Sequence, residues 1–120
     1  MPHISTDHEV LAAVFQARQG QRPSAGRKPA LHVLLWQRAL SPERGKWSLP
    51  GGRLGEDEDM TSSVHRQLAA KVDLREIAHL EQLAVFSDPN RVPETRTIAS
   101  TFLGLMPSPA TPELPADTRW

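Results

Sequence analysis

The stretch Trp47-Ser48-Leu49-Pro50-Gly51-Gly52-Arg53-Leu54-Gly55-Glu56-Asp57-Glu58 decides the fold of this 120-residue chain. Its glycines let the backbone turn tightly or approach another group closely, and a run of acidic side chains follows them. Asp59 is the predicted N-cap of a helix over residues 60–72. The apolar stripe of that helix recurs every four residues, at Met60, Val64, Leu68 and Val72.

The same stretch and helix resemble the Nudix box. The family pattern is a glycine, five residues, a glutamate, seven residues, then Arg-Glu-apolar-x-Glu-Glu-x-Gly-apolar. Laid from Gly52, this chain retains Glu58, Arg66, Leu68 and Leu74. It has Gln67, Ala70 and Lys71 at the three helical glutamates, and Asp73 at the second glycine. The frame of the box is retained, and the expected metal ligands are replaced.

Positions 67, 70 and 71 share one face of the predicted helix, because they are three and four residues apart. Three carboxylates there could hold one magnesium ion, which prefers oxygen ligands. An amide, a methyl group and an ammonium cannot replace them. Two unit charges 4 Å apart interact by roughly 4 kcal/mol at an effective dielectric of 20, so Lys71 would repel a divalent ion. We therefore expect no cofactor, with magnesium required only if the chain is a hydrolase.

The segments that flank the box extend the resemblance from about Val10 to Trp120. A Nudix fold implies an α+β chain with a mixed sheet sandwiched between helices. Apolar runs predict its strands, and polar stretches over 19–29 and 42–45 predict its loops. The predicted strands are Val10–Phe15, Leu31–Trp36, Glu81–Phe86 and Thr97–Leu105.

The end of the sequence, 107–120, is a proline-rich tail that cannot continue a helix or a central strand. In relatives, a stretch like Asp117-Thr118-Arg119-Trp120 leads into one more strand and a closing helix. We therefore expect residues 1–120 to form a single Nudix-like domain, truncated before that strand and helix. A disordered tail is the alternative.

The pattern of replaced residues in the box is most similar to that of the actinobacterial Nudix-related transcriptional regulators of NAD metabolism. Their N-terminal Nudix-like domain senses ADP-ribose, and a C-terminal winged helix binds DNA. The resemblance implies a non-catalytic domain that binds ADP-ribose or a related nucleoside diphosphate. One alternative is a hydrolase of nucleoside diphosphate derivatives, with a degenerate metal site made from Glu56, Glu58 and either Asp88 or Glu94. Another is a structural or dimer-forming domain with an empty cleft.

Eight residues are the candidate ligand contacts: Arg38, Gly51, Gly52, Arg53, Glu58, Arg66, Gln67 and Lys71. Arg38 and Arg53 are candidates for phosphate because a guanidinium matches oxyanion geometry, and solvated surface arginines are the alternative. Gly51 and Gly52 either admit a diphosphate or only form a tight turn. For Arg66 we favour a brace on the loop through Glu58.

Several other residues carry a structural interpretation that we favour over a functional one. Trp47 and Phe86 could stack on adenine, but core packing is the commoner role of lone aromatics. His65 is expected to be exposed on the helix, and His32 to be packed in a strand. The basic side chains Arg18, Arg22, Arg27 and Lys28 are expected to be a solvated loop rather than a nucleic-acid contact.

Composition limits the partners. The 14 basic and 14 acidic residues give a net charge of zero, so no global field favours nucleic acid. The chain has no cysteine, which fits a reducing compartment, and no segment predicts a signal peptide or a membrane span. We expect a cytoplasmic protein with no membrane partner. DNA binding would need a C-terminal domain, and a homodimer follows from the resemblance.

Overall fold

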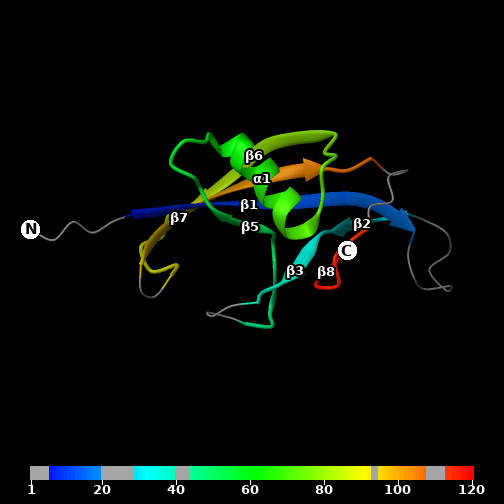
Figure 1. Ribbon diagram of the computed structural model, residues 1–120, viewed down its shortest axis with the longest axis horizontal. Coiled ribbons are helices and arrows are strands. Elements are labelled where there is room, and N and C mark those ends of the chain that lie inside the picture. Colours follow the sequence, from blue (N-terminus) through cyan, green and yellow to red (C-terminus); the bar gives the residue numbers. More distant parts are fainter. Residues whose placement is uncertain (1–5, 20–28, 40–43, 93–94, 108–112) are drawn as a thin grey trace, which may run out of the picture.

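Eight strands and one helix make up the part of the chain that the computed structural model describes, residues 6–19, 29–39, 44–92, 95–107 and 113–120 (Figure 1). The elements are β1 (Thr6–Gln19), β2 (Pro29–Val33), β3 (Leu35–Gln37), β4 (Trp47–Ser48), β5 (Gly51–Arg53), α1 (Met60–Val72), β6 (His79–Phe86), β7 (Arg96–Leu105) and β8 (Thr118–Arg119). No helix among these residues is long and apolar enough to cross a membrane.

The main sheet has the order β2-β1-β7-β6, and β5 pairs with β1 off this path. β1 and β7 are parallel over ten residue pairs, from Thr6 opposite Arg96 to Phe15 opposite Leu105. The pairs β1–β2, β1–β5 and β6–β7 are antiparallel. The predicted mixed sheet and α+β class are therefore confirmed. β1 extends well beyond the apolar run at 10–15 that predicted it.

The predicted strand 31–36 is divided by Leu34, which lies between β2 and β3. The Leu34 N–H donates to the Val14 carbonyl at 2.9 Å, and its side chain is fully buried. Beyond it the chain leaves the main sheet, and β3 joins a second sheet of order β4-β3-β8. Thr118 in β8 pairs with Trp36, which corrects our expectation of a tail without a strand over 107–120. Pairing with β3 supplies the partner that a two-residue strand needs.

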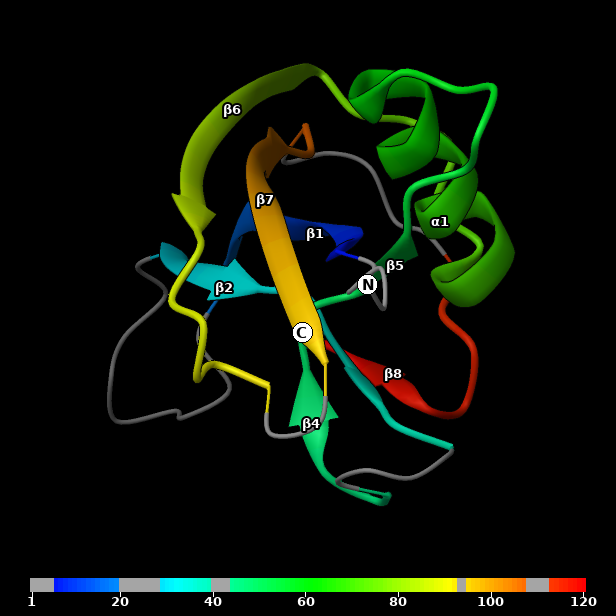
Figure 2. The ribbon, with the colours of Figure 1, turned by 90° about the vertical axis from the view of Figure 1, so that its left-hand side faces the viewer.

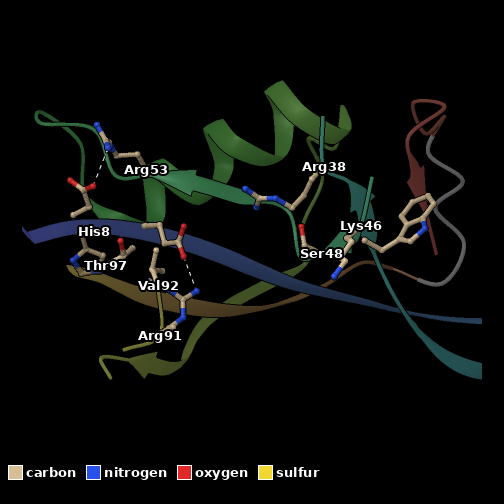
Figure 3. A pocket seen from close by; sticks show the side chains of 11 residues that line it. His8, Arg38, Lys46, Ser48, Arg53, Arg91, Val92 and Thr97 are labelled. Atoms are coloured by element: carbon tan, nitrogen blue, oxygen red, sulfur yellow. Dashed lines mark hydrogen bonds and ion pairs between the residues drawn. The ribbon is translucent and has the colours of Figure 1, made fainter. Parts of the chain in front are cut away.

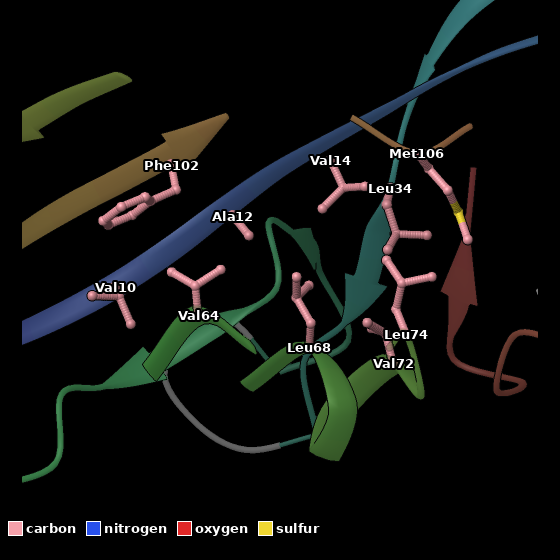
Figure 4. Close-up of a cluster of buried hydrophobic side chains, with 10 residues drawn as sticks. All are labelled: Val10, Ala12, Val14, Leu34, Val64, Leu68, Val72, Leu74, Phe102 and Met106. Atoms are coloured by element: carbon pink, nitrogen blue, oxygen red, sulfur yellow. The ribbon is translucent and has the colours of Figure 1, made fainter. Parts of the chain in front are cut away.

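The core lies between β1 and α1 (Figure 4). Side chains alternate across a strand, so Val10, Ala12 and Val14 of β1 share one face. Val64 and Leu68 of α1 belong to the same buried cluster, as the predicted helical stripe requires. In Figure 2, α1 lies beside β5, which begins the segment 51–55 that we call the glycine-rich loop.

The helix begins and ends as its sequence predicts. The Asp59 carboxylate accepts a hydrogen bond from the Ser62 N–H at 2.8 Å, which makes it the N-cap and lowers its pKa. At the other end, Asp73 has φ 51° and ψ 36°, the left-handed conformation that usually selects glycine. The Leu74 N–H then closes the helix on the Leu68 carbonyl at 3.1 Å. Asp73, at the position of the second glycine in the Nudix pattern, therefore adopts a conformation that glycine most readily supplies.

We expect Asp73→Gly to stabilise the protein by roughly 0.5 kcal/mol, because glycine adopts positive φ without steric cost and loses part of that gain to unfolded-state entropy. Asp73→Ala should destabilise it by about 1 kcal/mol, since alanine is strained there and cannot form local polar contacts. Urea unfolding of the three proteins measures both changes. The account of this helix end is wrong if alanine is tolerated as well as glycine.

Candidate functional site

Glu58 and Arg66 hold the glycine-rich loop against the start of α1. Glu58 Oε1 accepts hydrogen bonds from the Gly55 N–H at 2.7 Å and from Arg66 Nη2 at 2.6 Å, and Oε2 accepts from Arg66 Nε at 2.9 Å. Arg66 also donates to the Arg53 carbonyl at 3.2 Å. The hydrogen bonds from Arg66, followed by the one from Gly55, lower the pKa of Glu58 to about 2. The geometry is that of a brace, the role we favoured for Arg66.

Gln67 and Lys71 lie beneath the loop, at two of the three positions where the family carries metal-binding glutamates. Gln67 Nε2 donates to the Arg53 carbonyl at 3.1 Å, and Lys71 Nζ donates to the Gly51 carbonyl. A Cβ atom at Gly52 would lie 2.7 Å from Lys71 Nζ and 2.7 Å from Gln67 Oε1. Glycine at 52 therefore lets the loop rest directly on these two side chains.

The Lys71 ammonium is partly buried. It lies 4.9 Å from the centroid of the Trp36 ring, a cation–π distance. Burial lowers the pKa of Lys71, and the positive charge of Arg38 lowers it further. A charge in this setting is stabilised by the Gly51 carbonyl and the ring, and it can be stabilised further by an anion.

These residues do not fit a magnesium ion. Gln67 and Lys71 present hydrogen-bond donors to the loop, and Ala70 is exposed and offers no ligand atom. Glu58 already bonds to Arg66 through both oxygens. Asp88 accepts from the Asn90 N–H and lines a separate cavity with Val85 and Phe86, and Glu94 lies outside the described residues. Among the residues that the structure describes, no cluster of three or more carboxylate or histidine side chains could hold a divalent ion.

Two clefts adjoin this loop. The larger, of about 700 Å³, has its lining side chains on β1, β4, β5, β7 and the segments around Arg38 and Arg91 (Figure 3). Its charged lining residues are Arg38, Lys46, Arg53, Arg91, Asp7 and Glu9. The smaller cleft, of about 320 Å³, is lined by Lys71, by Trp36 and by Gly51 and Gly52 of β5. Arg38 and Glu9 line both clefts, so a single ligand could extend from one into the other.

The predicted contacts divide into two groups. Arg38, Gly51, Gly52 and Lys71 surround the smaller cleft, and Arg53 joins Arg38 in the larger one. Glu58, Arg66 and Gln67 line neither cleft and instead support the loop from the helix. The larger cleft also contains four charged residues that were not predicted from the sequence: Lys46, Arg91, Asp7 and Glu9. The alternation of Asp7 and Glu9 was visible in the sequence, but only their position on β1 beside β5 places them at the site.

The two aromatic residues for which we favoured core packing are exposed, which corrects that interpretation. Trp47 is 42% exposed and Phe86 is 50% exposed. Trp47 belongs to β4 in the small second sheet and lines the larger cleft, where its ring lies 5.6 Å from the Arg119 guanidinium. Phe86 ends β6 at the edge of the main sheet. His65 is exposed on α1, as expected.

Comparison with known proteins gives a consistent set of relatives. A family model described as NUDIX domain matches residues 7–119. The ADPR responsive transcriptional repressor NtrR of Acinetobacter baylyi is 30% identical over 96 residues, which cover 78% of this chain and 34% of that protein. The NUDIX domain of Shewanella oneidensis NrtR complexed with ADP ribose is similar with a TM-score of 0.77 and 27% identity, over 98% of this chain and 73% of that chain.

A hydrolase shares the fold to the same degree. A bifunctional NMN adenylyltransferase/ADP ribose pyrophosphatase from Francisella tularensis also has a TM-score of 0.77, at 24% identity, over 100% of this chain and 34% of that chain. At that identity the likeness shows the fold alone. The chain spans about a third of the length of the curated relative that it matches.

The brace predicts a pH dependence of stability. The pKa of Glu58 falls from 4.5 to about 2 on folding, so its contribution is present above pH 4.5 and is lost as the pH falls toward 2. We expect Glu58→Gln to be less stable than the wild type at neutral pH, with a difference that narrows between pH 4.5 and 2. Thermal unfolding across this range measures it, with Glu76→Gln on an exposed site as the control. A constant difference down to pH 2 would contradict the brace.

Proposed function

The chain belongs to the NUDIX family, and we propose that it is a non-catalytic ligand-sensing domain of a transcriptional regulator of NAD metabolism. Its ligand is ADP-ribose or a related nucleoside diphosphate. One observation carries the proposal: the Lys71 ammonium and the Gln67 amide stand at helical metal-ligand positions and bond to the glycine-rich loop. Two similar proteins support the choice of ligand. NtrR is described as an ADPR responsive repressor, and the NUDIX domain of NrtR is complexed with ADP ribose.

The positive charge of Lys71 takes over the electrostatic task of a divalent ion. The Lys71 ammonium has three N–H donors, and it donates one hydrogen bond to the Gly51 carbonyl. Further donors can serve a phosphate oxygen in the smaller cleft, where Arg38 offers a planar guanidinium. The diphosphate is thereby neutralised and held without a metal-bound nucleophile, so the ligand stays intact.

The larger cleft suits the rest of the nucleotide. Its volume of about 700 Å³ is within the usual range for small-molecule sites, and its exposed Trp47 offers an aromatic face for a base. Arg53 lies there rather than beside Lys71, so we assign it to the nucleotide side of the diphosphate. Because Arg38 lines both clefts, it is the expected centre of the diphosphate contact.

The proposal gives ligand sensing to this domain and DNA binding to a separate C-terminal domain, as the resemblance to winged-helix regulators implies. It also includes a cytoplasmic location and a homodimer. The competing function is a hydrolase with a rebuilt metal site, for which Glu58 would have to give up its bonds to Arg66. A domain with an empty cleft is the third reading. Ligand binding in a chelator separates the first from both alternatives.

We expect no magnesium- or manganese-dependent hydrolysis of ADP-ribose above a buffer control, because residues 67, 70 and 71 provide no carboxylate. Chromatographic detection of AMP and ribose phosphate measures the reaction. A turnover on the order of 1 per second or more that a chelator abolishes would establish the hydrolase instead.

We expect Lys71→Ala to weaken ADP-ribose binding by about tenfold or more in calorimetric titration with a chelator present, because a charge-assisted contact contributes roughly 1.5–3 kcal/mol. Arg75→Ala, which removes one positive charge from an exposed residue just beyond α1, should bind like the wild type. Equal affinities of the Lys71 variant and the wild type, or binding only with added magnesium, would refute the role of Lys71.

A further inference from the structure

Two carboxylates stand among the cations of the larger cleft, and a site for an anion would be expected to exclude them. Asp7 Oδ2 accepts a hydrogen bond from Arg53 Nη2 at 3.1 Å, and Glu9 Oε1 accepts one from Arg91 Nη2 at 2.7 Å. The two ion pairs are the dashed lines at Arg53 and Arg91 in Figure 3. Both carboxylates therefore bond to arginines that line the cleft.

The two acidic residues share one face of β1 because they are two residues apart in a strand. The antiparallel register places Glu9 directly opposite Arg53, whose guanidinium reaches Asp7 instead. The side chains of Glu9 and Arg91 are only 30% and 28% exposed, so solvent does not fully screen their charges. A ligand phosphate in the cleft would meet these negative charges at short range.

The carboxylates change the charge balance that a ligand meets. Four cationic side chains and two carboxylates line the larger cleft, which leaves a surplus of two positive charges, and Lys71 of the smaller cleft adds a third. A diphosphate esterified at both ends carries about two negative charges, one per phosphate. A nucleotide with a free terminal phosphate carries about one more, because the second pKa of a phosphate monoester is about 6. Because Asp7 and Glu9 neutralise two of the positive charges, they reduce the attraction that the cleft offers to this additional charge.

We propose that Asp7 and Glu9 form a charge filter, which makes the cleft select diphosphates esterified at both ends over nucleotides that end in a free phosphate. This inference rests on the proposed function and adds a reason for selectivity to it. A sensor that answers to a doubly esterified diphosphate must ignore ADP and ATP, since a basic cleft alone would bind the more highly charged nucleotides more tightly. Carboxylates that partly neutralise the arginines supply the repulsive element.

Calorimetric titration with ADP-ribose, ADP and ATP in a chelator tests the filter. The wild type should bind ADP-ribose more tightly than ADP or ATP. The double variant Asp7→Asn/Glu9→Gln should gain about tenfold or more in affinity for ATP, and about threefold or less for ADP-ribose. Glu76→Gln removes a carboxylate from an exposed site outside both clefts and should leave all three affinities unchanged. Thermal unfolding verifies that each variant is folded. If the double variant is not folded, the single variants Asp7→Asn and Glu9→Gln replace it, and each should also gain affinity for ATP.

The outcomes separate the filter from the proposed function. If the wild type does not bind ADP-ribose, the proposed function is wrong. The charge filter is tested separately, by comparing the ATP affinities of the wild type and the carboxylate variants. An ATP affinity that is the same in the wild type and the carboxylate variants overturns the filter. A loss of affinity for all three ligands also overturns it, because the carboxylates would then only position the arginines. Equal gains in the Glu76 control would show a general charge effect and overturn it as well.

Discussion

The close approach of Gly51 to β1 is the constraint on which the site depends. A Cβ atom at this position would lie 2.2 Å from the Val10 carbonyl oxygen, so only glycine allows β5 to pair with β1 there. This pairing directs the Gly51 carbonyl toward Lys71 and brings Gly52 against the Gln67 and Lys71 side chains. It also sets Arg53 beside Asp7 and Glu9. One short strand thus positions the side of both clefts that Gly51, Gly52 and Arg53 form.

The glycine-rich loop is retained because it is structural, whatever chemistry takes place beside it. The hydrogen bonds that Gly55 and Arg66 donate to Glu58 brace it, and they use no residue of the altered positions 67, 70 and 71. Replacing the carboxylates at these three positions therefore leaves the conformation of the loop unchanged. It changes the charge of the side chains beside the loop. An ammonium held by a carbonyl and an indole ring offers a ligand one fixed positive charge. A fold shared by hydrolases and sensors can change function at these few side chains without a new backbone.

Local signals predicted some parts of the structure well. The limits of α1 follow from the Asp59 cap and the four-residue apolar repeat, which act within a few residues. The division of 31–36 at Leu34 could not be predicted, since both halves are apolar and the break depends on which sheet each half joins. β8 is hidden for the same reason, because two polar residues form a strand only with β3 as their partner. Trp47 is apolar by sequence, yet it lies half in solvent because β4 belongs to the small sheet.

The charged residues of the larger cleft could be predicted from the sequence only in part, for the same reason. Arg38 and Arg53 were found because they flank the recognisable motif, whereas Asp7 and Glu9 reach the cleft only through the register of β1 against β5. Manganese binding, followed by the loss of the free-ion signal in electron paramagnetic resonance, tests the central claim most directly. The account predicts that the chain leaves an equimolar Mn²⁺ signal unchanged, and that a variant with glutamate at positions 67, 70 and 71 reduces it. Stoichiometric Mn²⁺ binding by the wild type that Glu58→Gln abolishes would contradict the account.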